Sequence, residues 1–194
     1  HASLNPFVEN VIAYRRSVFI ISLSVPVLFY FCLKQKFNNK DNLLLILIAS
    51  TIFLSPYFRT SSYWGLEENY GIISLLLTFL FLNFFLKNKN EYGYKIYFQL
   101  FLLIFFSSLC IYFDQKLLII PIICFLSIIT SKKIIKLKLF SICFYFILSL
   151  PYIYLIILWD GIFPNTLTSA RNLGDKLYLD HIGYTSTIIA FYFV

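Results

Sequence analysis

Long apolar runs separated by short polar breaks make up most of this chain. The runs are residues 17–33, 43–58, 71–86, 96–113, 117–129 and 139–159, and a further apolar run begins at Thr187. A helix needs about 20 apolar residues to cross a bilayer, and polar loops then join one crossing to the next. The pattern therefore predicts an all-α, polytopic membrane protein with six complete transmembrane helices and part of a seventh.

Two of these predicted spans stay short, whereas the run 71–86 is expected to extend backwards through Leu66. Residues 43–58 would form a helix of about 24 Å, which suits a locally thin or wet bilayer. Residues 117–129 are shorter still and contain Pro121. The chain does not begin with Met, and its last apolar run stops before it could span. We therefore expect residues 1–194 to form a single integral-membrane domain that is truncated at both ends.

Composition excludes a soluble globular domain. Hydrophobic residues make up 60% of the chain, aromatic residues 21% and charged residues 13%, and the mean hydropathy is +0.80. Soluble domains are nearer half apolar and carry about twice this share of charge. The net charge of +7 lies in the loops, where it bears on orientation in the bilayer and not on nucleic-acid binding.

Lysine and arginine are unevenly divided between the two sides of the membrane. With alternating spans, ten fall on one side and six on the other, and the second side also carries seven of the nine acidic residues. Because cytoplasmic loops are enriched in Lys and Arg, the lysine-rich side is predicted to be cytoplasmic. We expect the functional residues on the opposite, exoplasmic side, which holds Arg59, Glu67, Glu68, Asp114, Lys116, Asp175 and His181.

The polar stretch of residues 55–71 stands out from its apolar surroundings. Ser55 followed by Pro56 is typical of a helix start, with serine as the N-cap and proline at the first helical position. In a continuous helix, a cation, a hydrogen-bonding aromatic residue and a carboxylate would share one face. These residues are Arg59, Tyr63 and Glu67.

Glycine within this stretch supports a second interpretation equally well. Gly65 weakens a continuous helix, so the chain could break between Thr60 and Gly65 and start a new helix near Ser62. Glu67 and Glu68 would then lie in a first helical turn, where the helix dipole favours carboxylates.

The residue types in this stretch suit phosphate and hydroxyl chemistry. The guanidinium of Arg59 could clamp a phosphate, while Glu67 or Glu68 could act as a general base toward a substrate hydroxyl. A structural ion pair at the membrane edge is the alternative, although ionisable groups so close to a span usually face a cavity. Tyr63 and Trp64 fit either a substrate contact or an interfacial aromatic belt.

A second group of candidates lies in the tight polar turn between the fourth and fifth runs. Lys116 could bind a lipid phosphate as a point charge, with Asp114 beside it. Alternatively, the two residues could simply make the tight turn polar. Arg15 and Arg16 could bind an anionic headgroup or snorkel at a helix end. His181 is a candidate acid or base by residue type.

The sequence indicates no metal ion or cofactor. The cysteines lie within apolar runs without metal-ligand or redox-pair spacing: Cys32, Cys110, Cys124 and Cys143. No Walker or Rossmann motif predicts a nucleotide site. The middles of the predicted spans contain no ionisable residues, which disfavours an ion-coupled transporter.

Three short motifs carry a family resemblance. The last polar segment contains Trp159-Asp160-Gly161, then Gly174-Asp175-Lys176, with His181 downstream. The turn after the fourth run reads Phe113-Asp114-Gln115, and the central stretch offers proline, aromatics and then a carboxylate. Together these features resemble the GT-C class of polytopic glycosyltransferases, and within it the dolichyl-phosphoglucose-dependent alpha-1,2-glucosyltransferase family. The chain departs from that family in having Asp114 in place of an arginine and a longer loop before Gly174.

This resemblance implies an inverting hexosyltransferase of the bacterial inner membrane or the endoplasmic reticulum membrane. A polyprenyl-phosphate-linked sugar would be the donor and a lipid-linked glycan the acceptor, with a carboxylate activating the acceptor hydroxyl. In such enzymes the first exoplasmic loop, which would precede His1, usually carries that carboxylate. In this chain Glu67 and Glu68 are the candidate catalytic residues. The candidate substrate-binding residues are Arg59, Tyr63, Trp64, Asp114, Lys116, Asp175, Lys176 and His181.

A function of a different class is compatible with the same residues. A transporter, flippase or assembly subunit for lipid-linked sugars would need the same contacts to a lipid phosphate but no general base. An acidic residue in the loop before His1 would favour the enzyme over this alternative.

Overall fold

The computed structural model describes residues 10–37, 40–87, 93–131 and 133–159. The chain divides into two compact units, residues 1–148 and residues 149–194. Within the described residues every regular element is helical, so the predicted all-α class is confirmed for that part. The elements are α1 (Val11–Ser22), α2 (Ser24–Lys36), α3 (Asn42–Ser50), η1 (Thr51–Leu54), α4 (Pro56–Trp64), α5 (Glu68–Lys87), α6 (Tyr94–Phe113), η2 (Gln115–Leu118), α7 (Ile119–Thr130) and α8 (Ile135–Trp159).

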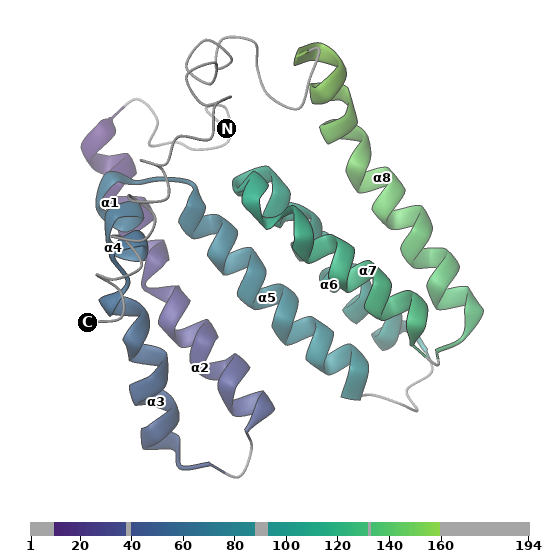
Figure 1. The fold of residues 1–194 in the computed structure, drawn as a ribbon, viewed down its shortest axis with the longest axis horizontal. Helices are drawn as coiled ribbons and strands as arrows, with labels where there is room; N and C mark the ends of the chain where they lie inside the picture. The colour runs from purple at the N-terminus through teal and green to yellow at the C-terminus, as the bar shows by residue number, and fades with distance from the viewer. Residues whose placement is uncertain (1–9, 38–39, 88–92, 132, 160–194) are drawn as a thin grey trace, which may run out of the picture. The chain divides into compact units, whose positions relative to one another are not determined.

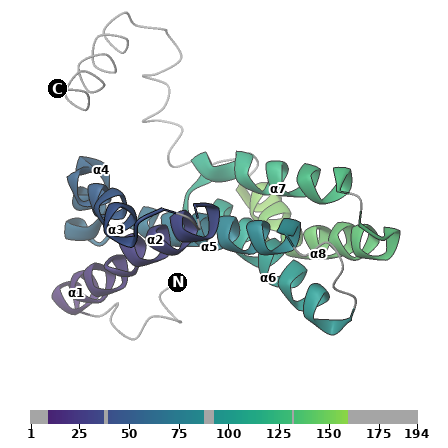
Figure 2. The same cartoon turned by 90° about the horizontal axis from the view of Figure 1, so that it is seen from below.

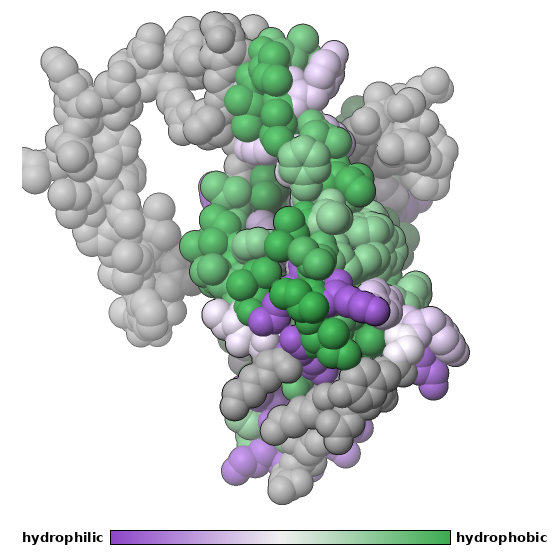
Figure 3. Space-filling view, turned by 90° about the vertical axis from the view of Figure 1, so that its right-hand side faces the viewer, coloured by the Kyte–Doolittle hydropathy of each residue, from purple (hydrophilic) through white to green (hydrophobic). Residues whose placement is uncertain are grey.

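Four stretches of the described chain are long and apolar enough to cross a bilayer. They are Val11–Lys36, Glu68–Lys87, Tyr94–Phe113 and Ile135–Leu158, with 26, 20, 20 and 24 residues. Large apolar side chains are exposed along these helices, and Figure 3 shows them covering most of the visible described surface, with hydrophilic side chains gathered lower down. Such a surface suits lipid and not water. The chain is therefore a multi-pass integral membrane protein.

The six complete spans predicted from the apolar runs are not all present. The run 43–58 is divided between Asn42–Leu54 and Pro56–Trp64, which are bent by 64° relative to each other. The bend arises at Ser55, whose extended backbone ends η1 while its side chain accepts a hydrogen bond from the Phe58 amide and starts α4. If this bent pair counts as one span, the described chain has five.

Two other predicted boundaries also change. The fifth run lies within an apolar helical segment, Lys116–Thr130, which is shorter than the four spans. The first span begins earlier than predicted, because the Asn10 side chain accepts hydrogen bonds from the Ile12 and Ala13 amides and caps α1. The predicted seventh span lies outside the described residues.

Helix α5 lies at the centre of the first unit. It packs between α2 and α6 in the view of Figure 1 and in the perpendicular view of Figure 2. Small polar side chains line its contact with α6, where Thr78 lies 4.0 Å from the sulfur of Cys110. Small residues let membrane helices approach closely, which explains the tight α5–α6 pairing. Larger apolar side chains, including Phe85, Leu100 and Ile128, form the core of the same region.

Many polar residues of this unit lie at two opposite ends of its helices. The site end comprises the start of α1, all of α4, the start of α5 and the end of α6 with η2. Here a Cβ on Gly71 would lie 3.2 Å from Leu117 Cδ1 and 3.4 Å from Asp114 Cβ. The lysine-rich end comprises the ends of α2 and α5, where Lys87 Nζ donates to the Gln35 carbonyl oxygen.

Candidate functional site

The break between α4 and α5 decides which predicted residues share a face. Helix α4 ends at Gly65, whose φ of +71° is the left-handed conformation that favours glycine, and α5 begins at Glu68. A Cβ on Gly65 would also lie 3.3 Å from Arg15 Cα, so glycine allows α1 to approach. The continuous helix through Arg59, Tyr63 and Glu67 is therefore wrong.

The alternative interpretation, a broken helix, holds with a later break point. Thr60 and Ser62 are still within α4, so the new helix does not start near Ser62. Glu68 lies in the first turn of α5, as that interpretation expects. Glu67 precedes the helix, and its carbonyl oxygen accepts from the Tyr70 and Gly71 amides at 2.9 and 3.3 Å. Glu68 is thus the carboxylate that the helix dipole favours.

Asp114 connects the turn between α6 and η2 with helix α4 at the site end. Its Oδ1 accepts from the Lys116 backbone N–H at 3.0 Å and caps η2. Its Oδ2 accepts from the Tyr57 hydroxyl of α4 at 3.3 Å. The Lys116 ammonium lies 5.8 Å from the centre of the Tyr57 ring, and the charge of Glu68 also acts on that phenol. A cation, a carboxylate and a phenol therefore meet at the site end, within electrostatic reach of the Glu68 carboxylate.

Trp64 forms a second contact at the same end. The Arg15 guanidinium carbon lies 4.8 Å from the Trp64 ring centre, a cation–π distance. Tyr63 packs edge-on against Trp64 with ring centres 5.3 Å apart. Both aromatic side chains are still largely exposed. Arg15, which the sequence offered only as a headgroup or snorkelling residue, thus contacts the tryptophan at the end of α4.

Glu67 and Arg59 occupy different surroundings from those of Glu68. Glu67 lies just before α5, two residues after Gly65, which packs against Tyr14 and Arg15 of α1. Arg59 is exposed on α4.

A buried polar cluster behind the site was not predicted from the sequence. Asn69 is 1% exposed, and its Nδ2 donates to the hydroxyls of Ser22 and Ser62, both at 2.7 Å. Because these residues belong to α5, α1 and α4, the cluster ties together the three helices that carry the aromatic and acidic residues. Its sequence signal is an asparagine within the first turn of an otherwise apolar helix.

The remaining predicted residues lie outside the described part of the chain. These are Asp175, Lys176 and His181, together with the motifs around them. The structure therefore joins Asp114 and Lys116 to Tyr57 and places Glu68 at the start of α5. Tyr63 and Trp64 lie at the end of α4, and Arg59 is exposed on the same helix.

Comparisons with known proteins do not assign a family. No protein-family model matches the chain, and searches of curated proteins and of solved structures give no significant match. Functional inference therefore depends on the chemistry of the site and on the short motifs described above.

Proposed function

We propose that this protein is a membrane glycosyltransferase that moves a hexose from a polyprenyl-phosphate donor to an acceptor at the face formed by the site end. The supporting observation is the meeting of Tyr57 with Asp114 and Lys116, against the first turns of α5, the helix that Glu68 begins. Ionisable residues are costly at a membrane and usually mark a substrate path. A polyprenyl-phosphate sugar presents there the phosphate and hydroxyl groups that these residues can bind.

The proposed reaction is a single inverting displacement. Glu68 accepts the proton of the acceptor hydroxyl as the acceptor oxygen bonds to the anomeric carbon. The bond between that carbon and the phosphate oxygen breaks, and polyprenyl phosphate leaves with the bonding electrons. Lys116 stabilises the charge that develops on the phosphate, and Arg59 supplies a forked donor from the exposed face of α4.

The other residues of the site hold these groups in position. Asp114 holds the start of η2, which carries Lys116, against α4 through Tyr57. Trp64 and Tyr63 offer exposed rings on which a sugar or the first isoprene units can lie. Glu67 is a second candidate base, which acts from the α1 side of the site.

The test is sugar transfer from a polyprenyl-phosphate donor in membranes that contain the full-length protein. Glu68→Gln removes the base but keeps the size and polarity of the side chain, and we expect a loss of about a hundredfold or more. Asp41→Asn is the matched control, because it makes the same change at the lysine-rich end and asparagine can still cap α3. We expect near-normal transfer from that variant.

Three outcomes would separate the alternatives. Loss with Glu67→Gln but not Glu68→Gln would move the base to the α1 side. Retention of transfer in both variants would overturn the assignment of a base to this stretch. Wild-type protein that binds the donor without transferring sugar would instead support a non-catalytic flippase, transporter or assembly subunit.

A further inference from the structure

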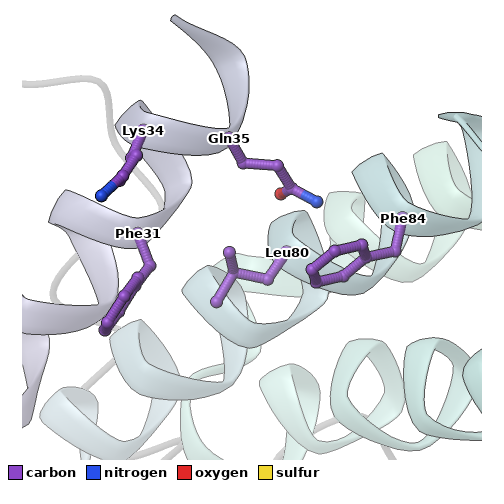
Figure 4. Close-up of a pocket in the computed structure, with 5 residues that line it drawn as sticks. All are labelled: Phe31, Lys34, Gln35, Leu80 and Phe84. Atoms are coloured by element: carbon purple, nitrogen blue, oxygen red, sulfur yellow. The ribbon is translucent and has the colours of Figure 1, made fainter. Parts of the chain in front are cut away.

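A pocket of about 300 Å³ lies between α2 and α5 at the lysine-rich end, away from the proposed active site. It is lined by Phe31, Lys34 and Gln35 from α2 and by Leu80 and Phe84 from α5 (Figure 4). Phe31 and Phe84 are 49% and 45% exposed. Because these helices are candidate membrane spans, the exposed apolar side chains of the lining suit contact with acyl chains.

The amide of Gln35 is the unusual group in this pocket. Both its Nε2 and its Oε1 are shielded from solvent and have no hydrogen-bond partner among the described residues. In Figure 4 the amide extends from α2 toward Phe84, over apolar side chains. Buried amides are normally paired, and an unpaired one is destabilising. A bound group that offers both an acceptor and a donor would remove this cost.

Positive charge surrounds the same pocket. The stem of Lys34 lines it, and the Lys34 ammonium lies 5.7 Å from the Tyr30 ring centre, pointing away from the amide in Figure 4. Lys87 approaches from α5 to donate to the Gln35 carbonyl oxygen. The lining contains no acidic residue. The long lysine side chains can reorient toward an anion at the membrane surface.

We propose that this pocket binds an anionic phospholipid whose headgroup carries a hydroxyl. On binding, the Gln35 and Lys34 side chains turn toward the lipid: the phosphate accepts a hydrogen bond from Gln35 Nε2 and pairs with the ammonium of Lys34, while a headgroup hydroxyl donates to Gln35 Oε1. The acyl chain begins along the apolar surface of Phe31, Leu80 and Phe84. The lipid is thereby held where α2 meets α5, and the site is separate from the proposed transferase site.

Phosphatidylglycerol with a photoactivatable acyl chain is a suitable probe, because it has both the phosphate and the hydroxyls. The full chain is placed in nanodiscs of phosphatidylcholine containing a small fraction of this probe, and labelling of α2 and α5 is measured. We expect Gln35→Leu to reduce labelling about tenfold. This variant should fold, since replacing an unpaired buried amide with an apolar side chain is neutral or stabilising.

Lys34→Gln and Lys36→Gln form the matched pair that separates a site from general attraction. Both remove one positive charge from the last turn of α2, but Lys36 does not line the pocket. We expect Lys34→Gln to reduce labelling several-fold and Lys36→Gln to leave it near wild type. Equal losses would overturn the proposal in favour of non-specific attraction between lysines and anionic lipid.

Gln35→Glu adds a further check, because a carboxylate at the same position should repel the phosphate and abolish labelling by phosphatidylglycerol. The phosphatidylcholine analogue should label weakly in every variant. Equal labelling by the two lipids would overturn the anionic headgroup. Displacement of the probe by millimolar inorganic phosphate would overturn the lipid assignment and indicate a site for free phosphate.

Discussion

The two ends of the first unit differ in how their charges are arranged. At the site end, acids and bases are mixed and contact aromatic or polar partners, as in the Tyr57–Asp114 hydrogen bond and the Arg15–Trp64 contact. At the lysine-rich end, the charged residues are almost all lysines and Gln35 is left unpaired. Acidic and basic groups held in fixed positions are suited to chemistry on a substrate. Lysines alone are suited to anchoring the protein in the membrane and to binding anionic lipid.

This difference has a structural origin in the connections between helices. Asp114 caps η2 directly after α6, and Gly65 turns the chain directly before α5, so the site end is built by tight turns. Tight turns fix side-chain positions, which a catalytic group requires. The two ends should therefore respond differently to the same kind of substitution.

The largest expected difference is in the side of the membrane from which each end can be labelled. In a cysteine-free background, single cysteines at positions 68 and 134 should be labelled by an impermeant thiol reagent from opposite sides. Position 68 starts α5, and position 134 lies just before α8 at the other end of the helices. Labelling of both positions from the same side would contradict the predicted topology.

Arg59→Ala should have the next largest effect. Loss of one charge-assisted contact to a phosphate typically slows turnover about a hundredfold. Arg59→Lys should restore part of the activity, because lysine keeps the charge and loses the fork. Lys95→Ala at the opposite end is the control and should leave sugar transfer unchanged. Normal transfer by Arg59→Ala would remove Arg59 from the site and leave phosphate binding to Lys116.

The sequence was sufficient to predict the helices but not to predict where and how they break. Runs with uniform apolar character, such as 71–86 and 96–113, correspond to the single helices α5 and α6. The run 43–58 looked like one span because hydropathy carries no information on chain direction. Ser55 and Pro56 indicated a helix start within that run, but not the 64° angle at which the chain bends there. Likewise Gly65 indicated a break, and the break lies at the glycine itself, whose left-handed backbone ends α4.

The candidate site was partly predictable for a related reason. Residue types and alternating loops placed Glu68, Asp114 and Lys116 on the same side of the membrane. The grouping of Asp114 and Lys116 with Tyr57 depends on contacts between residues 57 positions apart, which local patterns cannot reveal. Asn69 was missed because a single polar residue in an apolar helix carries no periodic signal, although its contacts join three helices.

Gly71→Ile should destabilise the site end, since its Cβ would lie within 3.4 Å of both Leu117 and Asp114 and a longer side chain has no space. Overpacking of this kind typically costs about 1–3 kcal/mol. Gly71→Ala is the matched control and should be close to neutral, because the flexible Leu117 side chain can move and alanine favours the helix. Thermal unfolding in detergent measures both. Equal stability of the two variants would show that α5 and η2 are not packed closely.

The smallest expected effect is that of Tyr57→Phe. This change removes the hydroxyl that donates to Asp114 and keeps the ring beneath the Lys116 ammonium. A long, partly exposed hydrogen bond contributes about 0.5–1 kcal/mol, so transfer should fall only about threefold. Tyr94→Phe, on an exposed tyrosine at the start of α6, should have no effect.

If Asp114 itself bound substrate, Asp114→Asn would reduce transfer far more than Tyr57→Phe. Equal and small losses from these two variants would indicate instead that Asp114 only positions η2, with Lys116 as the group that meets the phosphate.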